Sequence, residues 1–309
     1  MLKEALKDEL TQTEQSLLSS GFDVIGDIAV VRVDEKLDSK KELIASLILE
    51  KNKVIKTVLR QTSAVEGEYR IRGLEYLAGE RKTTTLHREN GCVFHVDLSQ
   101  VYFSPRLSHE RLRVAHMVSP GETVVNMFAG VGAFSILIAR RRPGARVFSI
   151  DKNPVAHDLQ LANIRVNKVD QRVIPLLGDA GEIIRSSLRG RADRVLMPLP
   201  ERASEFLPDA QLALKDLGGV IHFYVHVHAD RNSDPIAVAV AALTPQLSRV
   251  HRVGGSRVVR EVGPRWFEVG LDLVLGGKGV MAPTGGVTAS SLPAWAAWPS
   301  DSAGPGPRS

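Results

Sequence analysis

The chain has 309 residues, 43% of them hydrophobic, which is enough apolar material for one large domain or two modest ones. Its net charge of +5 suits a polyanionic partner, and its single cysteine, Cys92, excludes an intrachain disulfide and a zinc site built from several cysteines. The N-terminus is charged and the longest uncharged apolar run, 236–243, is too short to span a bilayer, so we expect a cytoplasmic protein.

The first hundred residues predict a small α+β domain, 1–100. Asn90-Gly91 favours a tight two-residue turn between two strand-like segments, so a hairpin is expected there. A polar stretch, 102–111, follows and bridges to the next domain. In chain order, we predict a short polar helix, a strand, a helix, a strand and the hairpin over residues 1–20, 22–33, 42–50, 54–60 and 83–98.

A second domain, 101–275, is predicted from alternating strand and helix patterns. This order is typical of a parallel doubly wound sheet, here closed by a final antiparallel strand at 266–275. Residues 276–309 are rich in Gly, Pro, Ser and Ala and predict a disordered tail. The alternating segments are 123–128, 133–141, 146–151, 154–167, 172–177, 180–187, 193–197, 201–216, 219–225, 234–247 and 249–253.

A glycine-containing segment, 124–136, organises the second domain. An apolar run ends at Gly130 and Gly132, and a helix-like apolar pattern follows, as in the first strand, turn and helix of a nucleotide-binding unit. Asp151 ends the next predicted strand, 21 residues after Gly130. A carboxylate at that point can accept hydrogen bonds from both hydroxyls of a ribose.

Two cofactors fit this pattern. A dinucleotide fingerprint requires a third small residue, but Ser135 stands at that position and bulky Phe134 lies where the helix would meet the phosphates. S-adenosylmethionine (AdoMet) carries no phosphate and tolerates this loop. The segment therefore favours AdoMet over a dinucleotide, the structural alternative being a glycine turn that binds no cofactor.

Several segments resemble the archaeal and eukaryal tRNA guanine-37 N1-methyltransferases, in a short form without the family's separate N-terminal domain that contacts the tRNA elbow. The resemblance implies a class I AdoMet-dependent methyltransferase fold, Rossmann-like, with a smaller N-terminal α+β domain for RNA binding and the pocket. It also implies methyl transfer to N1 of guanosine 37, with the tRNA anticodon stem-loop bound by a monomer. The segments that carry it are 63–70, 87–91, 101–107, 126–136, 151–154, 197–200, 205–207 and 218–224.

Methylation of guanine N1 requires a base for the N1 proton and a cation beside O6. The resemblance suggests Glu110 as the base and Arg70 as the partner of O6, with Tyr102 and Arg106 at the substrate. If a helix begins near Ser104, Arg106 and Glu110 share a face, and a solvated salt bridge between them is the alternative.

The resemblance and the positions of the motifs also predict the residues that contact the cofactor. Asp151 is expected to hold the ribose and Asp179 to accept from the adenine amino group, although each could instead cap a helix. The full predicted set is Asn126, Phe128, Gly130, Gly132, Asp151, Asp179 and Pro198.

Two positions depart from the family pattern. Asn126 stands where the family usually has aspartate, so a hydrogen bond to the cofactor is kept without charge. The family's Asn-x-Pro signature is here Pro198-Leu199-Pro200, with Pro200 expected at the substrate. The lost amide side chain leaves recognition of the base to backbone groups.

Two further patterns have competing interpretations. The alternation of His222, Tyr224, His226 and His228 places them on one side of a strand, and without an acidic partner we predict a half-exposed face and no metal. The basic stretch 249–265 either contacts RNA phosphates or is a solvated surface. Two rival functions remain open: a wybutosine-pathway aminocarboxypropyl transferase that uses AdoMet, and a catalytically idle tRNA-binding homologue.

Overall fold

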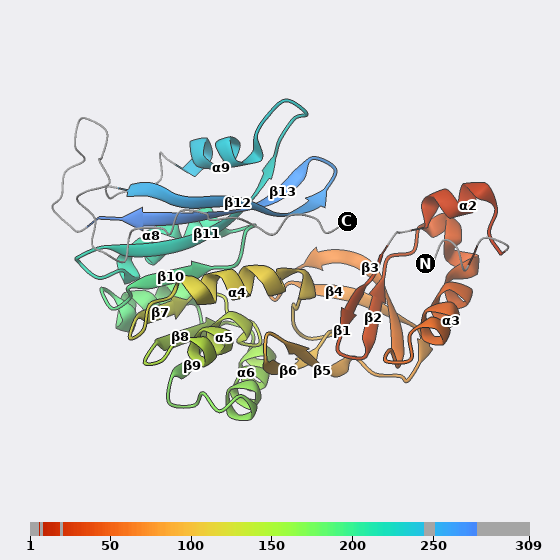
Figure 1. Ribbon diagram of the computed structural model, residues 1–309, viewed down its shortest axis with the longest axis horizontal. Helices are drawn as coiled ribbons and strands as arrows, with labels where there is room; N and C mark the ends of the chain where they lie inside the picture. Colours follow the sequence, from red (N-terminus) through yellow and green to blue (C-terminus); the bar gives the residue numbers. More distant parts are fainter. Residues whose placement is uncertain (1–5, 7–8, 19–20, 244–250, 277–309) are drawn as a thin grey trace, which may run out of the picture.

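The computed structural model describes residues 6, 9–18, 21–243 and 251–276 (Figure 1). Apart from Gly276, the predicted tail lies outside the described residues, and so does Arg249. The helical segments are α2 (Gln12–Leu17), η1 (Glu35–Lys40), α3 (Lys41–Lys51), η2 (Pro105–Leu107), α4 (Ser108–Met117), α5 (Ala133–Arg141), α6 (Pro154–Val166), α7 (Ala180–Ile183), η3 (Ile184–Leu188), α8 (Ala203–Ala213) and α9 (Pro235–Leu243). The strands are β1 (Asp23–Ile25), β2 (Ile28–Val31), β3 (Thr57–Glu66), β4 (Ile71–Gly79), β5 (Thr84–Glu89), β6 (Cys92–Asp97), β7 (Thr123–Asn126), β8 (Arg146–Asp151), β9 (Val173–Leu177), β10 (Arg194–Met197), β11 (Gly219–His228), β12 (His251–Gly263) and β13 (Trp266–Leu275).

The N-terminal part is a four-stranded sheet, β1-β2-β3-β4, that packs against α3 (Figure 1). Our prediction of one strand over 22–33 was wrong, because β1 and β2 form an antiparallel hairpin. Gly26 makes the turn at φ +57°, and a Cβ there would lie 2.6 Å from the carbonyl oxygen of Leu86. Apolar residues lie on both sides of this turn, so the apolar pattern alone did not indicate where one strand ends and the next begins.

The hairpin predicted around Asn90-Gly91 is confirmed as β5 and β6. Asn90 and Gly91 both have positive φ, +49° and +78°, as a two-residue hairpin turn requires. Strand β6 packs against α6, and Asn163 Oδ1 accepts a 2.7 Å hydrogen bond from the His95 backbone N–H. The hairpin thus joins the core of the second part of the chain, and our domain boundary at residue 100 stays a prediction.

The second part contains a seven-stranded sheet in the order β12-β13-β11-β10-β7-β8-β9. Strands β11, β10, β7, β8 and β9 are parallel, and β13 pairs antiparallel with β11 over ten residue pairs. The predicted final antiparallel strand is therefore confirmed. Of the segment predicted at 249–253, residues 251–253 begin the much longer β12, which adds a second antiparallel strand at this edge, and residues 249–250 lie outside the described part of the chain.

Helices cover both faces of this sheet, as a doubly wound fold requires (Figure 1). Val124 and Leu196 belong to the core shared with α4, α5 and α6, whereas their neighbours Val125 and Val195 belong to the core with α8 and α9. The central strands β7 and β10 are buried on both sides, which explains their nearly continuous apolar sequences. The Rossmann-like fold predicted from the sequence is confirmed. Among the described residues, no helix is long and apolar enough to cross a membrane.

The stretch 102–111, predicted as a polar bridge, instead folds into η2 and the first turn of α4. Two of its charged residues, Glu110 and Arg111, are buried. Arg111 donates from Nε and Nη2 to the two carboxylate oxygens of Glu89, both at 2.6 Å. Because these charges are paired internally, a polar sequence can occupy a buried helix face here.

Candidate functional site

The first strand of the unit, β7, lies at the point where the strand order changes direction, and open α/β sheets bind ligands at such points. A cavity of about 210 Å³ opens there, beyond the carboxyl ends of β7, β8 and β10. We call it the inner cavity. It brings together seven of the predicted residues, Arg70, Tyr102, Phe128, Gly130, Asp151, Asp179 and Pro198.

The glycine turn and Asp151 are joined by a direct contact at the wall of the inner cavity. Gly130 has φ +54°, and its backbone N–H donates a 2.6 Å hydrogen bond to Asp151 Oδ2. The Asn153 N–H donates to Asp151 Oδ1 at 2.9 Å. Burial raises the pKa of Asp151, against the effect of these backbone donors. The carboxylate is thereby held in one orientation at the end of β8.

Gly132 has a different role from the one predicted. It lies at φ +86° at the N-terminus of α5, and a Cβ there would be 2.9 Å from Gln160 Cγ. It does not line the inner cavity. Gly132 therefore permits the turn and the close packing of α6, whereas Gly130 faces the cavity.

Asp179 caps a helix, which confirms one of its two predicted interpretations, and its contact with the adenine amino group stays a prediction. Its Oδ1 accepts a 3.1 Å hydrogen bond from the Glu182 N–H, so it caps α7, and the residue also lines the inner cavity. On the same cavity wall, the rings of Phe128 and Phe206 meet edge to face with centroids 4.9 Å apart. Together these residues form an apolar wall beside a carboxylate, a combination suited to a heteroaromatic ring that carries an amino group.

Two residues that the sequence placed at the ligand, Asn126 and Pro200, lie elsewhere. Asn126 is fully buried, donates to Ser135 Oγ at 3.1 Å, and does not line the inner cavity. Pro200 is buried and lines neither this cavity nor the recess described below. Phe134, which the sequence analysis placed where the helix would meet a dinucleotide's phosphates, is buried with its ring 6.4 Å from that of Tyr224.

A second hollow of about 170 Å³ adjoins the inner cavity and shares Arg70 and Tyr102 with it. We call it the arginine recess. Arg32, Arg72 and Arg260 line it, and so do Glu201 and His226. None of these five residues was predicted to lie in a pocket, and together they give the recess a predominantly cationic lining.

Arg70 lines both hollows and lies where they adjoin. Its backbone has φ +55°, unusual for a residue with a side chain, and its guanidinium carbon lies 4.5 Å from the centroid of the Tyr102 ring. Its Nη2 also donates to Glu201 Oε1 at 2.6 Å. The predicted pocket residues Arg70 and Tyr102 are therefore in contact with one another.

Arg106 lines the arginine recess but does not pair with Glu110. It lies in η2, before α4 begins, and its Nε donates to Asp23 Oδ1 at 2.7 Å. The alternative of a solvated Arg106–Glu110 salt bridge is therefore wrong. The predicted helix starts two residues after Arg106, which removes the shared face on which that pairing depended.

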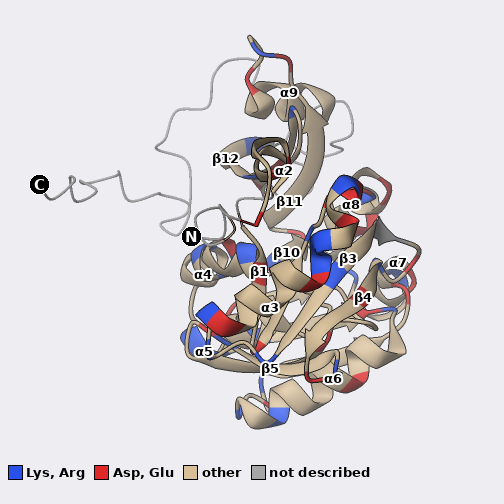
Figure 2. Ribbon diagram, turned by 90° about the vertical axis from the view of Figure 1, so that its right-hand side faces the viewer, with Lys and Arg blue, Asp and Glu red and all other residues tan. Residues whose placement is uncertain are grey.

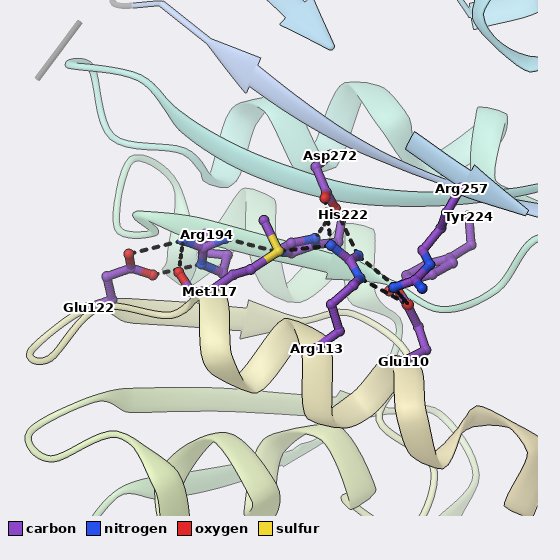
Figure 3. Close-up of polar contacts among 9 residues, drawn as sticks. All are labelled: Glu110, Arg113, Met117, Glu122, Arg194, His222, Tyr224, Arg257 and Asp272. Carbon is purple, nitrogen blue, oxygen red and sulfur yellow. Dashed lines mark hydrogen bonds and ion pairs between the residues drawn. The ribbon is translucent and has the colours of Figure 1, made fainter. Parts of the chain in front are cut away.

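Glu110 lies in a buried polar network between α4, β11 and β12 (Figure 3). Its Oε1 accepts from Tyr224 Oη and Arg113 Nη2, both at 2.7 Å. Its Oε2 accepts from Arg113 Nε at 3.0 Å and Arg257 Nη1 at 3.1 Å. The side chain is only 3% exposed and lines neither hollow. The Glu110 carboxylate therefore accepts four hydrogen bonds, which is about as many as a carboxylate can accept.

The network continues along the sheet beyond Glu110 (Figure 3). Arg113 also donates to both oxygens of Asp272, and Asp272 Oδ1 lies 2.6 Å from His222 Nδ1. Arg194 Nη1 lies 2.8 Å from His222 Nε2. Because arginine only donates, Nε2 is the acceptor and Nδ1 carries the proton, so His222 is neutral.

The prediction of a half-exposed histidine face without an acidic partner was wrong for His222. The antiparallel register of β11 and β13 places Asp272 directly opposite it, fifty residues later in the chain. His222 and Tyr224 are buried, whereas His228 is exposed. No group of three or more His, Cys, Asp or Glu side chains that could hold a metal occurs among the described residues.

Two arginines of the basic stretch pair with carboxylates of the protein. Arg257 contacts Glu110, and Arg260 donates to Glu268 Oε2 at 2.6 Å and to Tyr102 Oη at 3.1 Å. Residues three apart on a regular strand point to opposite faces, but a β-bulge between Val258 and Arg260 shifts the register. Nothing in the local sequence signals this bulge, so neither arginine could be assigned to the site in advance.

A parallel sheet with a glycine turn after its first strand, an acidic residue after its second and a cavity at the strand ends defines a class I, Rossmann-like α/β protein. The chain matches the TRM5/TYW2 methyltransferase domain over residues 85–241 and the TYW2 N-terminal domain over residues 2–83. It therefore belongs to the TRM5/TYW2 family.

The chain is similar in sequence or structure to three characterised members of this family. The chain is 41% identical over 270 residues to tRNA (guanine(37)-N(1))-methyltransferase Trm5b of Pyrococcus abyssi, covering 85% of this chain and 78% of the relative. It superposes on the complex of aTrm5 and tRNALeu with a TM-score of 0.78 at 34% identity, covering 89% and 78% of the two chains. For TYW2 of P. horikoshii in complex with MeSAdo, the TM-score is 0.70 at 30% identity, covering 89% and 98%.

Proposed function

We propose that this protein transfers a methyl group from AdoMet to N1 of guanosine 37 in tRNA, beside the anticodon. The observation that carries this proposal is the adjacency of the two hollows, which share Arg70 and Tyr102. A cofactor in the inner cavity and a base in the arginine recess would meet at these two residues. The higher identity to the Trm5b relative than to the TYW2 structure supports methyl transfer over aminocarboxypropyl transfer.

The residues of the inner cavity fit AdoMet. Asp151 accepts two backbone hydrogen bonds, which leaves acceptor capacity for ribose hydroxyls, and Asp179 lies on the wall that also carries Phe128. Gly130 presents no side chain at a positive φ, so a ligand can approach the backbone. When bound, AdoMet supplies an electrophilic methyl group on a sulfonium. The predicted contacts of Asn126 and Gly132 with it are not part of this proposal, because both lie outside the cavity.

The arginine recess receives the target base and its flanking backbone. Tyr102 holds Arg70 at the junction of the two hollows, and Arg70 donates to guanine O6, where negative charge develops as N1 loses its proton. Arg106 and the neighbouring arginines attract the phosphates of the anticodon stem-loop. In Figure 2, Lys and Arg also occur around the adjoining helix α8.

Glu110 takes the N1 proton in this proposal, as the family resemblance suggests. Its carboxylate is filled by four donors, so one donor must leave before the proton can arrive. Arg257 is the replaceable donor, because its side chain is 44% exposed while that of Arg113 is 19% exposed. Glu110 lines neither hollow, so the proposal requires that displacement of Arg257 by the polyanionic substrate open Oε2 toward the bound base. Arg113 and Tyr224 would keep the carboxylate in place.

Incubation of the protein with AdoMet and unmodified tRNA, followed by mass spectrometry of the nucleosides, tests this function. We expect 1-methylguanosine at position 37. An aminocarboxypropyl adduct would instead show the wybutosine-pathway activity, and an unmodified nucleoside would show the catalytically idle homologue. Either result would refute the proposal.

A further inference from the structure

Glu201 lines the arginine recess and has no role in the proposed methyl transfer. It follows Pro200 in the segment where the family's amide side chain is missing. Its Oε1 lies 2.6 Å from Arg70 Nη2 and 3.9 Å from His226 Nδ1. Its side chain is 43% exposed, in contrast to the buried Glu110. A carboxylate therefore stands at the open side of the recess, directly beside the cation assigned to guanine O6.

The arrangement of Arg70 and Glu201 matches the Watson–Crick edge of guanine. That edge presents an acceptor at O6 and donors at N1 and N2, and proteins read unstacked RNA bases through hydrogen bonds to such edges. Arginine only donates, and an ionised carboxylate only accepts. A guanine whose O6 contacts Arg70 thus turns its donor groups toward an acceptor, and Glu201 is the acceptor that already touches Arg70.

We infer that Glu201 determines specificity for guanine by accepting a hydrogen bond from the N2 amino group. This inference rests on the proposed function and adds a residue to it. N1 lies between O6 and N2 on the base, so a carboxylate at N2 leaves N1 accessible to the base and the methyl donor. Glu201 thereby supplies the side-chain contact that the replacement of the family's Asn-x-Pro signature by Pro198-Leu199-Pro200 removes.

In the protein without a bound base, Arg70 and Glu201 pair with each other. Each group neutralises the other while no base is present. The Glu201 side chain is 43% exposed and that of Arg70 17% exposed, so the carboxylate is the accessible member of the pair. Adenine would place an amino group against Arg70 and would offer no amino group to Glu201, so both contacts would be lost. Inosine keeps O6 and N1–H and lacks only the N2 amino group, which makes it the probe for Glu201 alone.

The test compares single-turnover methylation of two tRNA transcripts that differ only in guanosine or inosine at position 37. For the wild type, we expect guanosine to be preferred by about tenfold to a hundredfold in rate constant over KM, the range for one hydrogen bond to a charged group. In Glu201→Met, which removes the acceptor at similar length, the ratio should fall close to one. Glu201→Gln keeps one acceptor and should give an intermediate ratio.

Glu205→Gln is the matched control, because Glu205 pairs with Arg202 on the exposed side of α8 and lines neither hollow. Its preference for guanosine should equal that of the wild type. An unchanged preference in Glu201→Met, or an equal loss with both transcripts, would overturn the role of Glu201. Absence of methylation of either transcript by the wild type would instead refute the proposed function, so the two failures are distinguishable.

Discussion

Arg257 donates a 3.1 Å hydrogen bond to Glu110 and so joins the edge strand β12 to helix α4 (Figure 3). The glutamate side chain is 3% exposed and the arginine side chain 44% exposed. An exposed cation therefore covers a buried carboxylate. Such a cation is positioned to exchange its intramolecular partner for an RNA phosphate.

Replacing Arg257 by alanine tests whether it covers the base. We expect Arg257→Ala to weaken tRNA binding, because a cation is lost, while single-turnover methylation at saturating tRNA stays within about threefold of the wild type. Arg265→Ala is the charge-matched control, since Arg265 pairs with Asp230 at the surface. A loss of single-turnover rate as large as that of a Glu110 variant would show that Arg257 is needed in the reaction.

Glu110→Gln tests the proposed base. The amide keeps the size of the side chain but loses its basicity, so the methyl-transfer rate at saturating substrate should fall about 10²–10⁴-fold. AdoMet affinity should stay close to wild type, because Glu110 does not line the inner cavity. Single-turnover assays are needed, since slow product release can mask a loss in the chemical step. Near-normal rates would restrict Glu110 to a structural role.

Asp151→Ala tests the inner cavity. Loss of charge-assisted hydrogen bonds should weaken AdoMet binding by about 1.5–3 kcal/mol in calorimetry, and NAD should not bind the wild type. The same substitution at Asp158, 83% exposed on α6, should have no effect. Equal AdoMet affinity in the two variants, or tight binding of NAD, would contradict the assignment of the cavity.

The buried His222–Asp272 pair predicts a loss of stability in acid. Burial lowers the pKa of His222, so below about pH 6.5 the unfolded chain binds a proton that the folded chain excludes. Burial alone would raise the pKa of Asp272, but His222 and Arg113 hold it below its usual value. That contribution is present above about pH 4 and is lost as the pH falls further.

Thermal unfolding between pH 7.5 and 5.5 measures the histidine contribution. We expect the midpoint to fall by roughly 2–4 °C per pH unit below pH 6.5 from this residue. The slope should be smaller in His222→Gln, whereas His228→Gln, at an exposed position, should keep the wild-type slope. Identical slopes in all three proteins would mean that His222 is charged in the folded state.

The sequence alone predicted the alternating strand and helix order, the Asn90-Gly91 hairpin and the cluster of Phe128, Gly130, Asp151 and Asp179. These features depend on short-range patterns. Apolar periodicity reports which faces are buried, and parallel strands bring their carboxyl ends to one edge whatever their exact order. Residues placed at those ends therefore meet in the inner cavity.

Only the tertiary structure decided the surroundings of Glu110, His222 and Glu201. Their partners Arg257, Asp272 and Arg70 are 147, 50 and 131 residues away in the chain, and strand pairing or domain contact brings them together. A β-bulge in β12 also reverses the face on which Arg260 lies. Local sequence patterns do not specify the strand register or which charged residues become neighbours. Both depend on how the whole sheet is assembled.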